Sequence, residues 1–174
     1  MSKPTLKVTK DFTKQFNDAV KKFQYDKVLV GIPEDTDARK ETGEDQMIGN
    51  AALLAIANFG SPMNNIPPWP IMAIGIRNAQ DSIAEQFKVC AQKVLSSLVG
   101  GSSGLDAMDT YYNRAGLIAS TSVKKVINSQ EDVPPNKPSD ATMRSRKAIG
   151  FKGDKYWLVT GQMRNAITYV VRGR

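Results

Sequence analysis

Apolar residues recur at every third or fourth position in four segments of the chain, which is the spacing of one face of an α-helix. The spacing predicts helices over 9–23, 47–59, 73–98 and 105–127, and Thr9 is placed to cap the first. At about 1.5 Å per residue, the third helix is about 40 Å long. The glycine- and serine-rich segment 100–104 ends it as a flexible hinge, and this short connection predicts that the third and fourth helices form an antiparallel pair.

Each predicted helix has one apolar face that is expected to pack. These faces contain Phe12, Phe16, Ala19, Val20 and Phe23 in the first helix; Ile48, Ala51, Ala52, Ala55, Ile56 and Phe59 in the second; Ile76, Ala79, Ile83, Phe87, Cys90, Val94 and Leu98 in the third; and Met108, Tyr111, Ala115, Ile118, Ser122 and Val126 in the fourth.

Two short segments are typical of β-strands. Residues 27–32 are apolar and rich in β-branched side chains and end at Pro33, and residues 167–171 alternate after one helical turn over 161–164. Two strands so far apart among helices predict an α+β fold, and the length of the chain suits a single domain over 1–174.

The connecting segments have distinct compositions. Residues 34–46 form a polar, acidic loop, and residues 131–140 form a mobile proline-rich loop, after which Ser139 or Asp140 caps a short helix that ends at Ala148. Three prolines make residues 66–71 a stiff extended segment, here called the proline strap. The strap holds Trp69 in a fixed direction, either as a recognition element or, more commonly, packed over the core.

The formal net charge of +7 is carried by the C-terminal fifth of the chain, where residues 141–174 contain eight basic residues and one acid. Six acids gather in the polar loop at Glu34, Asp35, Asp37, Glu41, Glu44 and Asp45. The basic end is either a nucleic-acid footprint, a surface that faces acidic groups on a neighbouring subunit, or a solvated face without a partner. Having both an acid-rich loop and a base-rich end favours contact between copies.

Candidate chemistry is scarce. The chain has no histidine and one cysteine, Cys90, so it lacks His-based catalysis, a Cys–His zinc site and an internal disulfide. The acids do not follow a calcium-loop pattern, segment 100–104 is not a phosphate-binding loop, and the Gly150-x-x-Gly153 turn with its lysines is only a weak phosphate signal. We therefore expect a non-enzymatic protein without metal or cofactor. No segment has the length of apolar residues that a membrane span needs, and the first residues do not form a signal peptide, so synthesis in the cytoplasm is expected.

Three segments resemble the signatures of a known family. Residues 55–60 (AIANFG) followed by 66–71 (IPPWPI) resemble "A-x-x-x-E-F-G … I-P-P-R-P-F", and residues 158–169 (LVTGQMRNAITY) resemble "L-x-D-T-G-x-L-x-x-S-I-x-Y". Between them, Pro134-Pro135 with Thr142 and the run 144–147 (RSRK) resembles "P-P-L … T-I-x-x-R-K". In this order they resemble the HK97 gp10-like tail-completion proteins and the related Mu-type virion morphogenesis proteins. Asn58, Trp69 and Val159 depart from the charged residues that are common in the family.

The resemblance implies a small, curved, mostly antiparallel sheet packed against a long helix. It also implies a structural subunit of a phage virion neck, made in the host cytoplasm, that forms a homo-oligomeric ring (a hexamer or dodecamer). The ring would complete the tail and contact neck, portal-adaptor or tail-tube proteins and packaged DNA in the channel, without a membrane. The candidates for subunit contacts are Glu34, Asp35, Asp37, Pro67, Pro68, Trp69, Pro70, Arg144, Arg146, Lys147, Arg164 and Arg172. The alternative is a basic nucleic-acid-binding module that uses residues 141–174.

Overall fold

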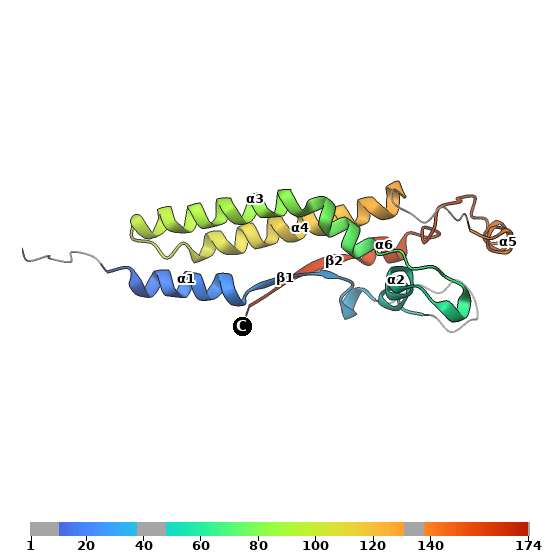
Figure 1. Ribbon diagram of the computed structural model, residues 1–174, viewed down its shortest axis with the longest axis horizontal. Coiled ribbons are helices and arrows are strands. Elements are labelled where there is room, and N and C mark those ends of the chain that lie inside the picture. Colours follow the sequence, from blue (N-terminus) through green and yellow to red (C-terminus); the bar gives the residue numbers. More distant parts are fainter. Residues whose placement is uncertain (1–10, 38–47, 131–137, 174) are drawn as a thin grey trace, which may run out of the picture.

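Two long helices, α3 (Ile71–Val99) and α4 (Leu105–Ser129), lie side by side and antiparallel along most of an elongated molecule (Figure 1). The computed structural model describes residues 11–37, 48–130 and 138–173. Helix α1 (Thr13–Tyr25) lies beside the turn between α3 and α4, and α2 (Asn50–Phe59), α5 (Asp140–Ala148) and α6 (Gln162–Ala166) gather at the other end. Two 3-10 turns, η1 (Glu34–Thr36) and η2 (Pro62–Asn64), complete the helical elements of the described residues.

The helical pair is held together by a close backbone approach at Gly75. A Cβ atom at this position would lie 2.6 Å from Cα of Val123, which leaves no room for a side chain. The Ser122 hydroxyl, on α4, donates a hydrogen bond to the carbonyl oxygen of Gly75 over 2.8 Å. The predicted antiparallel pair is therefore confirmed, with a close backbone approach near the start of α3.

The sheet consists of two antiparallel strands, β1 (Lys27–Gly31) and β2 (Thr168–Arg172), that lie far apart in the sequence. Val28 faces Val171, and Val30 faces Tyr169. The Tyr169 ring lies over α4 at Gly116, where a Cβ atom would be 2.2 Å from the ring. These contacts place the sheet on α4 and confirm the α+β class, with a small antiparallel sheet packed against a long helix.

Two clusters of buried side chains follow the long axis. One lies where α2, α3, α4 and α6 meet and contains Leu54, Ala57, Trp69, Ile71, Ile74, Val123, Val126, Ile127, Met163 and Ile167. The other lies near the turn of the helical pair and contains Ala19, Cys90, Val94, Leu98, Met108 and Tyr112. Cys90 is fully buried, as predicted.

Two predicted packing faces need correction. In α2 the predicted face is wrong, because Leu54 and Ala57 are buried whereas Phe59 is 77% exposed. In α1 only part of the predicted stripe packs: Ala19 is buried, but Phe16 and Val20 are close to half exposed. When the apolar face of a helix is wider than the element that packs against it, the sequence shows which residues are apolar but not which of them are buried.

The helix starts also shift. Helix α1 begins at Thr13, whose N–H donates to the Asp11 carboxylate over 2.9 Å, and the predicted cap Thr9 lies outside the described residues. Helix α2 begins at Asn50, three residues later than predicted. Ser139 caps α5 as predicted, because its hydroxyl accepts a hydrogen bond from the N–H of Thr142.

Candidate functional site

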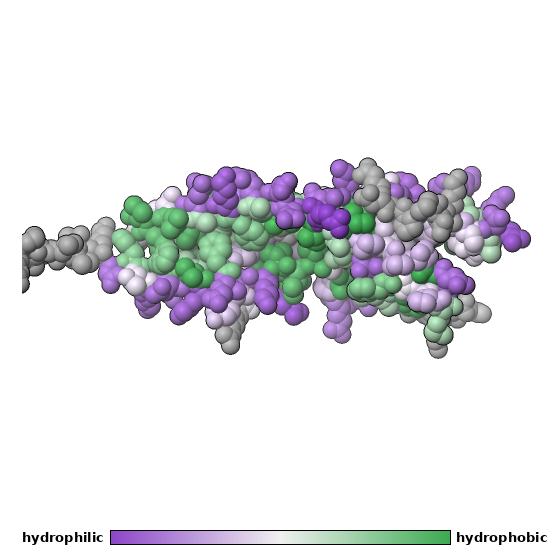
Figure 2. Space-filling model, viewed as in Figure 1, coloured by the Kyte–Doolittle hydropathy of each residue, from purple (hydrophilic) through white to green (hydrophobic). Residues whose placement is uncertain are grey.

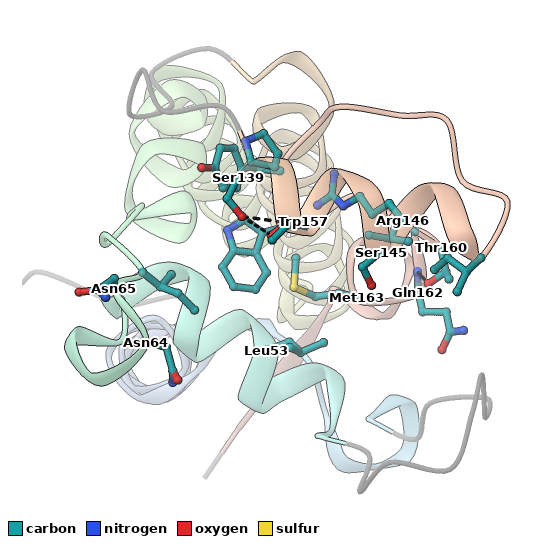
Figure 3. A pocket seen from close by; sticks show the side chains of 18 of the residues that line it. Leu53, Asn64, Asn65, Ser139, Ser145, Arg146, Trp157, Thr160, Gln162 and Met163 are labelled. Carbon is teal, nitrogen blue, oxygen red and sulfur yellow. Dashed lines mark hydrogen bonds between the residues drawn. The ribbon is translucent and has the colours of Figure 1, made fainter.

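A groove of about 1000 Å³ separates α5 from the rest of the molecule (Figure 3). One wall comes from α2 and the proline strap through Leu53, Ile66 and Pro67. The opposite wall is the inner face of α5, and residues 156–163 form the third side. Among the described residues, the lining is apolar or carries hydroxyl and amide groups, and Arg146 is its only charged member.

Helix α5 is joined to the body through its ends. It makes no extensive contact with another helix or strand of the described residues. Its inner face, formed by Ala141, Thr142, Ser145 and Ile149, borders the groove, and Ile149 is 67% exposed. A helix that turns such a face toward an open groove has surface left for a partner.

Arg146 points inward from α5 and is only 8% exposed. Its Nη1 donates hydrogen bonds to the carbonyl oxygens of Lys155 (2.8 Å) and Gly153 (3.5 Å), and its guanidinium lies over the Phe151 ring. Burial lowers the pKa of Arg146, and the charges of Tyr156 and Asp154 act in the opposite direction. Within the described residues no carboxylate forms an ion pair with it, and its Nε and Nη2 make no hydrogen bond.

The third side of the groove is positioned by Gln130 at the end of α4. The Gln130 side chain accepts a hydrogen bond from the N–H of Tyr156 (2.9 Å) and donates one to its carbonyl oxygen (3.2 Å). The next residue, Trp157, has a φ of 55°, a left-handed conformation that a bulky residue rarely adopts. No periodicity or motif marks either residue in the sequence.

The three segments that carry the family resemblance meet at this groove. The first contributes Ile66 and Pro67, the second Thr142 and Arg146, and the third residues 159–163. The first segment is separated from the other two by α3 and α4, and the antiparallel pairing of these helices brings it next to them. Pro134 and Pro135 of the second segment lie outside the described residues.

The acidic candidates divide into exposed and structural residues. Glu34 and Asp35 are exposed on η1 and make no ion pair with a described residue. Asp37 is half-buried, and its carboxylate accepts a hydrogen bond from the N–H of Ala51 over 2.6 Å, so it caps α2 from outside the helix. Asp37 therefore has an internal role, and its part in a subunit contact stays a prediction. The other acids of the predicted loop, Glu41, Glu44 and Asp45, lie outside the described residues.

The proline strap keeps its prolines at the surface and its tryptophan inside. Pro67, Pro68 and Pro70 are exposed, whereas Trp69 is 2% exposed and belongs to the core. The backbone N–H of Trp69 donates a hydrogen bond to the carbonyl oxygen of Ala57, and this bond joins the strap to α2. The more common of the two predicted roles of Trp69 is confirmed, and its side chain offers no surface to a partner.

The basic candidates do not form one surface. Arg146 is internal, and the side chains of Arg164 and Lys155 donate to the side-chain and backbone oxygens of Asn128, respectively. Arg144 and Lys147 are exposed on α5. Arg172 is exposed at the end of β2, which lies beside α1 and away from α5 (Figure 1).

A broad apolar area covers the half of the molecule around α1 and the turn of the helical pair (Figure 2). Exposed apolar side chains of these helices include Phe16, Val20, Leu95 and Val99. The face of the sheet that is turned away from α4 adds Leu29 and its cross-strand partner Val170. Contiguous exposed apolar surface of this kind is typical of protein–protein contacts.

Among the described residues, no cluster of three or more histidine, cysteine, aspartate or glutamate side chains is arranged to hold a metal ion. Nor does any described helix combine the length and hydropathy required to cross a membrane. Comparison of the chain with family models, with curated proteins and with solved structures found no match.

Proposed function

We propose that this chain is a structural subunit of a phage virion neck, which assembles into a ring that completes the tail and joins it to the head. The observation that carries the proposal is the meeting of the three family-like segments at one groove. Residues that resemble a family signature and lie far apart in the sequence gain functional weight when they build one surface. The apolar area around α1 supplies a further contact surface for a neighbour.

The alternative, a nucleic-acid-binding module, requires free cations that track a phosphate backbone. Of the eight bases in 141–174, Arg146 is buried, Lys155 and Arg164 are engaged by protein oxygens, and Arg174 lies outside the described residues. The free bases that remain are divided between α5 with its following turn and the end of β2. This distribution supports the assembly proposal over the nucleic-acid alternative.

The proposal is tested by the oligomeric state of the purified full chain in native mass spectrometry and analytical ultracentrifugation. A closed oligomer such as a hexamer or dodecamer is expected, alone or with neck and tail-tube proteins. A monomer under all these conditions contradicts the proposal. Duplex DNA binding is measured in parallel, and a steep loss of affinity with salt in a monomeric protein favours the alternative.

A further inference from the structure

We propose that the groove beside α5 binds the acidic turn η1 of a second copy of the chain, with Arg146 as the cation that receives the carboxylates of Glu34 and Asp35. This inference rests on the proposed ring assembly and names the contact that would form it.

The groove contains a buried cation without a carboxylate partner. Arg146 is more than nine-tenths buried, and its bonds to two carbonyl oxygens use Nη1 alone. Its Nε and Nη2 make no hydrogen bond to a described residue and remain available to a carboxylate, which pairs well with the planar guanidinium. Asp154 acts on Arg146 only through its charge, without an ion pair. Because the guanidinium is already desolvated, an entering carboxylate meets a cation that has lost part of its hydration.

No acid is found among the described residues that line the groove, and Arg146 is the charged residue among them. The rest of this described lining is apolar or carries hydroxyl or amide groups. The site therefore favours an occupant that carries carboxylates.

The turn η1 presents such carboxylates in a fixed position. The Thr36 hydroxyl lies within hydrogen-bond distance of the carbonyl oxygens of Pro33 (3.1 Å) and Ala166 (3.2 Å), and Asp37 is anchored on α2. Glu34 and Asp35 are thereby held at the surface without an ion pair among the described residues. A preorganised segment loses little conformational entropy on binding.

Turn and groove belong to different parts of the same molecule. The residues lining the groove do not include any residue of η1, and η1 lies below the sheet whereas α5 lies at one end of the molecule (Figure 1). Two complementary patches at different places on one chain join copies head to tail, and such contacts form a ring when the rotation between successive copies closes.

Charge reversal tests the contact. The acid variant carries Glu34→Lys and Asp35→Lys, and the groove variant carries Ala141→Glu and Ser145→Glu, which place carboxylates in the lining beside Arg146. All four positions are exposed. Each variant alone is expected to self-associate roughly tenfold more weakly than the unmodified chain. An equimolar mixture restores assembly, because each groove then faces a turn of opposite charge.

Matched controls change the same number of charges at exposed positions elsewhere in the molecule. Asp18→Lys with Asp81→Lys matches the acid variant, and Ala84→Glu with Thr121→Glu matches the groove variant. Both controls are expected to assemble like the unmodified chain. Circular dichroism of every variant separates loss of assembly from loss of folding.

The outcomes distinguish this contact from the proposed function. If the unmodified chain assembles and either variant assembles equally well, or the folded mixture fails to recover, the contact is refuted while the ring proposal stands. A monomeric unmodified chain refutes both. If the groove variant alone is defective and its defect is loss of binding to duplex DNA, the groove recognises phosphate and not a second copy, which also refutes the contact.

Discussion

The close approach of α3 and α4 at Gly75 makes a strong prediction about stability. In Gly75→Ala, the new Cβ would lie 2.6 Å from Cα and 2.9 Å from the backbone nitrogen of Val123. Carbon atoms pack at about 3.5–4.0 Å, so the two helices have to separate by roughly 1 Å at this point. The obstacle is backbone, and a side-chain rotation cannot remove it.

Three contributions decide the size of the effect. Overpacking of a tight contact costs about 1–3 kcal/mol. Separation of the helices also weakens the hydrogen bond from Ser122 to the Gly75 carbonyl, worth about 1 kcal/mol. Alanine favours the helix over glycine by about 1 kcal/mol, which offsets one of these losses. The expected net loss in the free energy of unfolding is therefore about 1–3 kcal/mol.

Urea unfolding followed by circular dichroism measures this loss. Ser122→Ala removes only the hydrogen bond and is expected to cost about 1 kcal/mol. Ala84→Gly, at an exposed position of α3, calibrates the helix-propensity term in the same helix. A Gly75→Ala variant as stable as the unmodified chain, or more stable, would refute the close backbone approach.

Three further predictions follow from single side chains. Asp37→Ala removes the acceptor at the start of α2 and is expected to lower the free energy of unfolding by about 1 kcal/mol, whereas the exposed neighbour Asp35→Ala leaves it unchanged. Burial, assisted by the charge of Asp26, raises the pKa of Tyr112 to about 12. Since the unfolded tyrosine ionises near pH 10, the free energy of unfolding keeps its full value below about pH 10 and falls as the pH rises toward 12. Tyr112→Phe should abolish that alkaline loss in pH-dependent unfolding, and an unchanged profile would contradict the burial of the phenol. Burial also raises the pKa of the Cys90 thiol, so a thiol reagent is expected to modify it only under unfolding conditions; rapid labelling of the native chain would count against a packed core there.

The elements of this fold that depend on local sequence could be predicted. The apolar spacing placed α3 and α4 within two residues of their observed ends, and the hydroxyl of Ser139 caps α5 as its position suggested. The β-branched segments became β1 and β2, each with a one-residue shift at one or both ends. These features depend on neighbours within a few positions, which a sequence displays directly.

The features that depend on distant partners could not be predicted. In the sequence, Asp37 is one of several acids in a polar loop. Its role at the start of α2 depends on how α2 packs against this loop. In the sequence, Arg146 is part of a basic run. In the structure its side chain is buried because it donates hydrogen bonds to carbonyl oxygens of the turn after α5. The groove arises because α3 and α4 fold back on each other, and no spacing within a single segment indicates such a surface.

The pairing of β1 with β2 has a consequence for how the chain is made. During synthesis β1 leaves the ribosome long before β2. The backbone N–H and C=O groups of β1 therefore lack their partner strand until β2, which follows α2 to α6 in the sequence, has been made. The helical pair depends on local contacts and forms early, whereas the sheet brings together the most distant parts of the described chain and forms late. Val28 and Val171 join the same buried cluster as Ala19 on α1, so α1 settles in its final place only with the last strand. The translated order of the chain therefore delays the finished shape of the molecule until almost all of it has been made.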